Sequence, residues 1–107
     1  GLGGRLPLAP RSGAYCGSML GVRATVVLGE RVADVELVGV PLGGTLRGVA
    51  FFGAQGNVVL DPAFDRALAR RGCAIEAVRL APEGDGMKVW VRLPLLGQRA
   101  LTLARAP

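Results

Sequence analysis

The residues best suited to do chemistry in this chain gather around Trp90, its only tryptophan. Strict alternation over residues 87–93 predicts a β-strand. Trp90 would then share one strand face with Lys88 and Arg92. A flat ring between cations can anchor a protein interface, stack on a nucleobase, or cover a second small core with cation–π support from Arg92. Arg99 follows in the next apolar run, and we take it together with these three residues as candidate contacts for a partner.

The two cysteines, Cys16 and Cys73, are the next candidates for chemistry. They form no CxxC motif, and because the chain has no histidine they cannot complete an ordinary zinc site. Two isolated cysteines are either buried thiols or one disulfide. A disulfide would close a long loop and stabilise a thin core by roughly 4 kcal/mol. We favour the disulfide, and with it an oxidising, extracytoplasmic compartment, either periplasmic or secreted.

Catalytic groups are sparse in the rest of the chain. Without histidine, the chain lacks the commonest general base and has no Ser–His or Cys–His pair to activate a nucleophile. The glycine-rich residues 39–48 lack the lysine of a phosphate-binding loop. Asp61 and Asp65 could share a helix face, but a helix cap and a dipole partner account for them. We predict no enzyme activity, no cofactor and no metal site; catalysis by carboxylates alone is the alternative.

Length and composition limit the classes of protein that this chain can belong to. It has 107 residues, of which 50% are hydrophobic and 20% charged, which indicates one folded domain and excludes intrinsic disorder. No apolar run approaches the roughly 18 residues that span a membrane. The net charge is +5, and Lys88 is the only lysine among the basic residues. An arginine-rich surface suits an acidic partner, although a bias in coding alone would also produce this composition.

Alternation and turn residues predict the elements. Closely spaced glycine and proline predict an irregular arm over residues 1–21. Apolar residues at every second position predict strands over residues 22–28, 32–40, 45–52, 58–60, 74–80, 87–93 and 99–105. Turn residues fill 53–57 and 82–86, and the last two runs are expected to pair as a hairpin.

One helix is predicted near residues 62–71. Asp61 can cap its free N–H groups, Pro62 suits the first helical position, and Gly72 can end it. The order of four strands, a helix and three strands lacks the alternation of a parallel nucleotide-binding sheet. We therefore predict a mainly β (α+β) fold, an antiparallel β-sandwich or a rolled sheet with this one helix, as a single β-rich domain over residues 22–105.

Three stretches resemble a known family: residues 35–40 (VELVGV), 47–52 (RGVAFF) and 55–58 (QGNV). They are similar to the small periplasmic homology-region β domain, which links the inner-membrane platform to the outer-membrane secretin in type II secretion and type IV pilus machines. Residues 74–78 and 99–103 would supply its later strands. The resemblance implies a non-catalytic scaffold that binds its partner through strand or sheet-face contacts.

Together these observations predict a non-catalytic, extracytoplasmic interaction or assembly module, in its more specific form a part of a pilus or secretion machine. Its partner would be another protein or a second copy of the chain. We expect no membrane span within this chain itself. The first alternative is a small basic β domain that binds nucleic acid. The second is the globular head of a pilin-like subunit.

Overall fold

The computed structural model describes residues 13–52, 58–80 and 86–106 of the chain. The predicted turn at 53–57, most of the predicted loop at 82–86 and the first part of the predicted arm lie outside the described residues. The described elements are β1 (Gly13–Met19), β2 (Val22–Leu28), β3 (Val32–Gly39), the short 3-10 helix η1 (Val40–Leu42), β4 (Gly44–Phe52), β5 (Val58–Leu60), α1 (Pro62–Arg70), β6 (Ala74–Leu80), β7 (Gly86–Leu93) and β8 (Gly97–Arg105).

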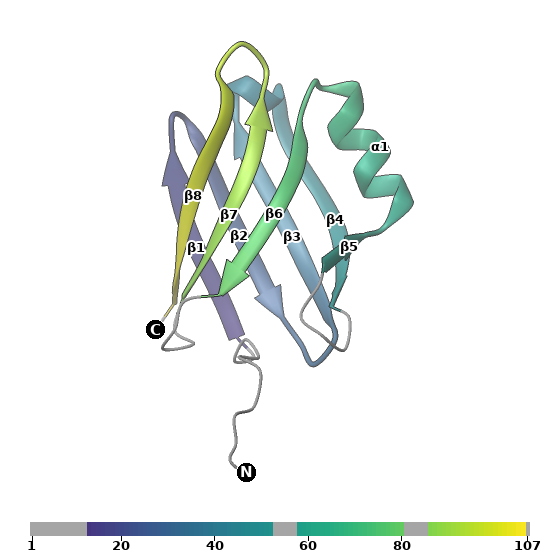
Figure 1. The fold of residues 1–107 in the computed structure, drawn as a ribbon, viewed down its shortest axis with the longest axis vertical. Helices are drawn as coiled ribbons and strands as arrows, with labels where there is room; N and C mark the ends of the chain where they lie inside the picture. Colours follow the sequence, from purple (N-terminus) through teal and green to yellow (C-terminus); the bar gives the residue numbers. More distant parts are fainter. Residues whose placement is uncertain (1–12, 53–57, 81–85, 107) are drawn as a thin grey trace.

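The described strands form one antiparallel sheet in the order β5-β4-β3-β2-β1-β8-β7-β6. Two meanders, β1–β5 and β6–β8, are joined where β1 pairs with β8, with Tyr15 opposite Arg105. The sheet curls into a nearly closed barrel, and α1 connects its two end strands (Figure 1). The mainly β prediction with one helix is confirmed; the barrel-like sheet matches the rolled alternative, and the sandwich alternative is wrong.

The interior of the barrel is made by the alternation that the sequence displays. Apolar side chains at every second position point inward from β2 (Val22, Ala24, Val26, Leu28) and from β7 (Met87, Val89, Val91, Leu93). Among the described residues, every fully buried residue is hydrophobic. Removal of this apolar surface from water is the main force that holds the barrel together.

Helix α1 begins and ends as its sequence predicts. The Asp61 carboxylate accepts a hydrogen bond from the backbone N–H of Ala63 at 3.1 Å, and Gly72 follows the helix with a φ of 72°. The helix buries Phe64 and Leu68 against the barrel. A Cβ atom at Gly48 of β4 would overlap the Phe64 ring, so a glycine in mid-strand makes room for the helix.

Strand β1 corrects the prediction of an irregular arm. Its residues were predicted to be irregular, yet they pair with β2 on one side and β8 on the other, between the two meanders. A Cβ atom at Gly17 would overlap the backbone carbonyl oxygen of Thr102 in β8. Glycine here permits a close approach between strands, and its density in the sequence concealed the alternation of Tyr15 with exposed Cys16.

Candidate interaction surface

The structure brings three of the four predicted contact residues together. Lys88, Trp90 and Arg92 lie on the outer face of β7, while Val91 between them points into the barrel. Arg99 pairs with Val91 in the register of β7 and β8, so it belongs to the inward series of β8. It is exposed because it lies near the rim of the barrel, close to the turn between these strands.

Trp90 lies between two alanines of the neighbouring strands. The register places Ala77 of β6 on one side and Ala100 of β8 on the other. The indole is half-buried, and the Lys88 ammonium lies 5.9 Å from its ring centroid, within the range of a cation–π interaction. Lys88 is thus a cation over the ring, whereas the covered-core alternative placed Arg92 there. We call Trp90, Lys88, Arg92 and the two alanines the tryptophan face.

An acidic residue at a β-bulge holds Arg92 in place. The register of β6 against β7 shifts between Ile75 and Ala77, so Glu76 is an extra residue on this edge strand. The Arg92 Nε donates to Glu76 Oε2 at 2.9 Å, and Gln98 Nε2 donates to Glu76 Oε1. Glu76 therefore orients Arg92 and balances its charge, and Lys88 lies within cation–π range of the ring.

The outer face of the other meander has a different form. An open hollow of about 480 Å³ runs over β2, β3 and β4; its side chains include Thr25, Val27, Asp34, Glu36, Arg47 and Val49. The Arg47 Nε donates to Glu36 Oε2 at 2.8 Å across this hollow. We call it the β2–β4 trough. Arg47 balances Glu36, Asp34 leaves the lining with one more acidic than basic group, and no aromatic residue lines it.

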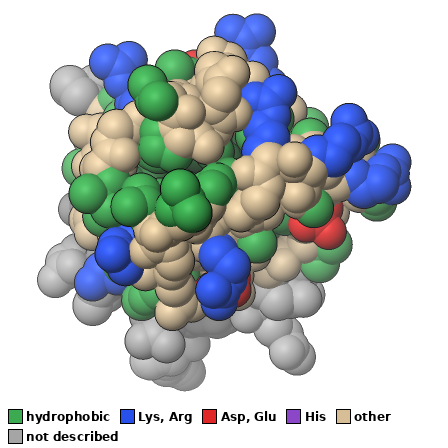
Figure 2. Space-filling view, turned by 90° about the horizontal axis from the view of Figure 1, so that it is seen from above, with side chains coloured by type: hydrophobic (Ala, Val, Ile, Leu, Met, Phe, Trp, Pro, Cys, Tyr) green, Lys and Arg blue, Asp and Glu red, His purple; other side chains and the backbone are tan. Residues whose placement is uncertain are grey.

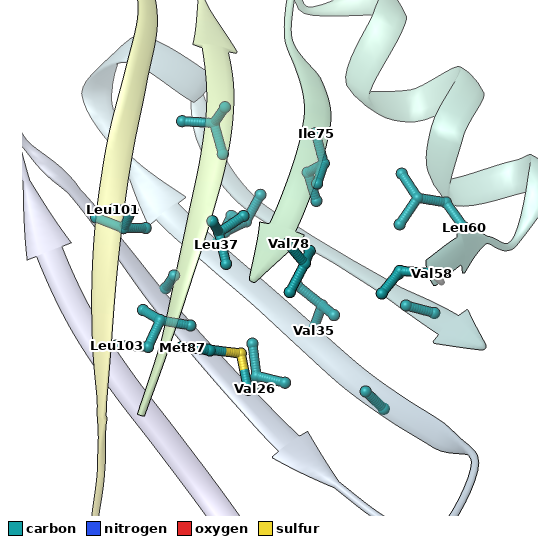
Figure 3. Close-up of a pocket in the computed structure, with 15 residues that line it drawn as sticks. Val26, Val35, Leu37, Val58, Leu60, Ile75, Val78, Met87, Leu101 and Leu103 are labelled. Carbon is teal, nitrogen blue, oxygen red and sulfur yellow. The ribbon is translucent and has the colours of Figure 1, made fainter. Parts of the chain in front are cut away.

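A small cavity lies in the barrel interior, and the end strands β5 and β6 form part of its wall. It has a volume of about 40 Å³ and an entirely apolar lining. Figure 3 shows Val58 and Leu60 of β5 on one side of it and Ile75 and Val78 of β6 on the other. Ordinary ligand pockets measure roughly 300–1,000 Å³ and contain a few polar groups. This space is a packing gap in the barrel interior, lined by residues of β2 through β8, and offers no group that could orient a substrate.

The predicted disulfide between Cys16 and Cys73 is wrong, since both thiols are free. Cys16 is exposed on β1, whereas Cys73 is buried just before β6. Strands β8 and β7 lie between β1 and β6. At roughly 4.8 Å per strand, β1 and β6 are therefore about 14 Å apart. A disulfide needs Cα atoms within about 7 Å of each other. With both thiols free, the cysteines give no indication of an oxidising compartment.

Cys73 has the properties of a structural thiol. Its Sγ donates a hydrogen bond to the carbonyl oxygen of Arg71 at 3.5 Å. Burial raises the pKa of the Cys73 thiol, and the positive charge of Arg71 offsets part of that rise. Within the described residues, no three His, Cys, Asp or Glu side chains gather as a metal ion would require. No helix in that part of the chain is both long and apolar enough to cross a membrane.

Comparison with models of protein families, with curated proteins and with solved structures gives no significant match. The resemblance to the homology-region domain therefore stays a prediction from the sequence. Of the tryptophan face, sequence reasoning found the three residues of β7 and missed Ala77 and Ala100. Only the register between strands reveals that small side chains flank the indole.

Proposed function

We propose that this chain is a non-catalytic protein-interaction module whose tryptophan face binds an acidic protein partner. One observation carries the proposal: the sole tryptophan lies on the outside of the barrel between two alanines, with Lys88 beside its ring and Arg92 fixed by Glu76. Tryptophan and arginine are enriched among the residues that dominate binding energy at protein interfaces. Flanking methyl groups allow a partner to approach the ring closely.

The charge of this face favours an acidic partner. Lys88 and Arg92 are both exposed, and the whole chain carries a net charge of +5. Complementary charge speeds association and selects among partners. A carboxylate of the partner could bind Lys88 directly or compete with Glu76 for Arg92.

The same charge would suit nucleic acid, the alternative function. Proteins that bind single strands stack successive bases on several aromatic residues. The tryptophan face offers one aromatic ring, and Lys88 already lies near it. These features favour a protein partner. A role in a pilus or secretion machine, outside the cytoplasm, is the more specific form of the proposal and rests on the sequence resemblance.

A photo-crosslinking pair tests the proposal in cells that produce the full-length protein. A benzophenone amino acid replaces either Thr102, which lies opposite Lys88 on β8, or Val27, which lines the β2–β4 trough. We expect a discrete protein adduct from position 102, which disappears in the Trp90→Ala background. Adducts from position 27 alone, or adducts from 102 that survive Trp90→Ala, would contradict it. A product from position 102 that nuclease removes would favour nucleic acid.

A further inference from the structure

A second surface lies at the end of the barrel where three turns meet. These turns join β1 to β2, β3 to β4 through η1, and β7 to β8, and α1 ends beside them. Their tips carry Leu20, Val40 and Leu95, which are 50%, 91% and 106% exposed. Figure 2 views this end and shows hydrophobic side chains gathered on it, with basic side chains at several points around them and acidic atoms at one side.

Contacts between the turns make this end one continuous surface. The Arg71 Nη1 donates to the carbonyl oxygen of Leu42 at 2.6 Å and so joins the end of α1 to η1. Gly72 lies beside Pro94, since a Cβ atom at Gly72 would be 3.6 Å from the proline Cγ. We define the turn surface by its three apolar tips (Leu20, Val40, Leu95) and the nearby exposed arginines (Arg23, Arg70, Arg99).

The two leucines of the turn surface adopt backbone conformations that leucine disfavours. Leu20 has a φ of 53° and Leu95 a φ of 65°, in the left-handed region that glycine adopts without cost. Leucine in this conformation is destabilising, and at these exposures it gains little from burial. The packing of the barrel therefore does not explain why leucine occupies these tips.

We propose that the turn surface inserts its apolar tips into an anionic lipid bilayer. Val40 and Leu95 are almost fully exposed, so they project as separate points instead of lining a groove that a protein segment could fill. A fluid bilayer can accept several such points at once. Exposed arginines near its surface are attracted to anionic headgroups. The acidic residue of β6 near this end, Glu76, has its charge balanced by Arg92.

This surface is separate from the tryptophan face. The tips belong to the turns, whereas Trp90 lies on the wall of the barrel, in the middle of β7. The inference does not depend on the proposed protein partner, and a module could use both surfaces together. Membrane contact at one end would leave the wall accessible to a protein.

Co-flotation with vesicles tests the inference through variants that relieve backbone strain. Leu20→Gly and Leu95→Gly place glycine where φ is positive, so both proteins should fold at least as well as the parent chain. We expect the parent to float with vesicles of phosphatidylcholine mixed with phosphatidylglycerol, and less with phosphatidylcholine alone. The double glycine variant should bind the mixed vesicles roughly tenfold more weakly or worse. Val27→Ser, exposed on the wall, should bind as the parent does.

Three results would overturn the inference. The parent chain could fail to bind the mixed vesicles, which is the result expected if the turn surface binds a protein. The double glycine variant could bind as tightly as the parent. Binding could also be equal on neutral and anionic vesicles and insensitive to Arg99→Gln. Circular dichroism and thermal unfolding of each variant separate a loss of binding from a loss of fold.

Discussion

The two meanders of the barrel share one kind of inner face and differ in their outer faces. Each outer face has one cross-strand ion pair, Arg47–Glu36 in the β2–β4 trough and Arg92–Glu76 on the tryptophan face. The trough otherwise holds Asp34 and small or branched side chains, whereas the other face presents Trp90. Exposed ion pairs contribute about 0–1 kcal/mol each, so these pairs do not separate the two faces energetically. The tryptophan with Lys88 beside its ring does, because the exposed aromatic residue of the other meander, Phe51, lies outside the trough.

This difference shows which positions the fold constrains. Inward positions must be apolar in both meanders, because each forms part of one common core. Outward positions are free of that demand, and there the two halves diverge. We therefore expect substitutions inside the barrel to affect both meanders together, and substitutions outside it to affect one function at a time.

The largest effect is expected from Leu68→Ala, which removes a buried side chain of α1 from the common core. The cavity should lower the free energy of unfolding by about 2–5 kcal/mol. Urea unfolding followed by circular dichroism measures the change. Arg66→Ala on the exposed side of the same helix serves as the control and should change stability by no more than about 0.5 kcal/mol. Equal stability of the two variants would show that α1 does not anchor the barrel.

Trp90→Ala should separate the two outer faces most clearly. We expect it to weaken binding of the protein partner by about 2 kcal/mol or more, roughly a thirtyfold loss of affinity. Val27→Ala in the β2–β4 trough should leave that affinity nearly unchanged. Isothermal titration with the partner captured by crosslinking compares them. If Val27→Ala had the larger effect, the trough would be the contact surface.

The next effect is a dependence of stability on pH that arises inside the barrel. Burial raises the pKa of Cys73, so the folded protein retains the thiol proton at pH values where the unfolded chain loses it. This contribution is fully present below the unfolded pKa and is lost as pH rises through the folded one. Stability should therefore fall on the alkaline side. Urea unfolding over a pH series, on the parent and on Cys73→Val, measures this loss.

The cysteine on the outer wall provides the control for this prediction. Cys16→Ala should keep the alkaline loss of stability, because Cys16 is exposed. In the native parent protein, an alkylating reagent should modify Cys16 quickly and Cys73 slowly. Rapid modification of both thiols would contradict the burial of Cys73. So would a loss of stability at alkaline pH that persists in Cys73→Val.

The smallest effects are expected from the two ion pairs. Glu36→Gln and Glu76→Gln should each lower stability by about 0.2–1 kcal/mol, and less at high salt. Glu76→Gln should cost slightly more, because Glu76 also accepts a hydrogen bond from Gln98 and its pair with Arg92 is less exposed. Double-mutant cycles with Arg47→Gln and Arg92→Gln give the coupling energies. A coupling energy above about 2 kcal/mol between Arg47 and Glu36 would contradict this order, because the stronger ion pair would then lie in the trough.

The sequence correctly predicted the elements whose residue pattern lies within one short stretch of the chain. Alternation located seven strands, and the cap at Asp61 with proline at the next position located α1. The missed strand, β1, has glycine where β8 approaches closely, a requirement that only the tertiary structure reveals. The predicted disulfide failed because strand order, which sets the distance between β1 and β6, depends on pairing between distant parts of the chain.

The candidate site was predictable to the same extent. Alternation within β7 places Lys88, Trp90 and Arg92 on one face without knowledge of any neighbour. The alternation that directs Leu101 inward also assigns Arg99 to the inward series, so its separation from Trp90 was readable in the sequence. The alanines beside the indole and the pairing of Arg92 with Glu76 depend on register, which a β-bulge shifts by one residue.

Hydroxyl-radical footprinting tests the central claim most directly, because each outer face carries an aromatic residue that radicals oxidise. Trp90 marks the tryptophan face, and Phe51, 43% exposed on β4, marks the other meander. Oxidation is compared between the purified protein and the same protein in gently lysed cells that produce it. The account predicts that oxidation of Trp90 falls severalfold in the cell lysate while that of Phe51 is unchanged. Equal oxidation of Trp90 in both samples, or protection of Phe51 instead, would contradict it.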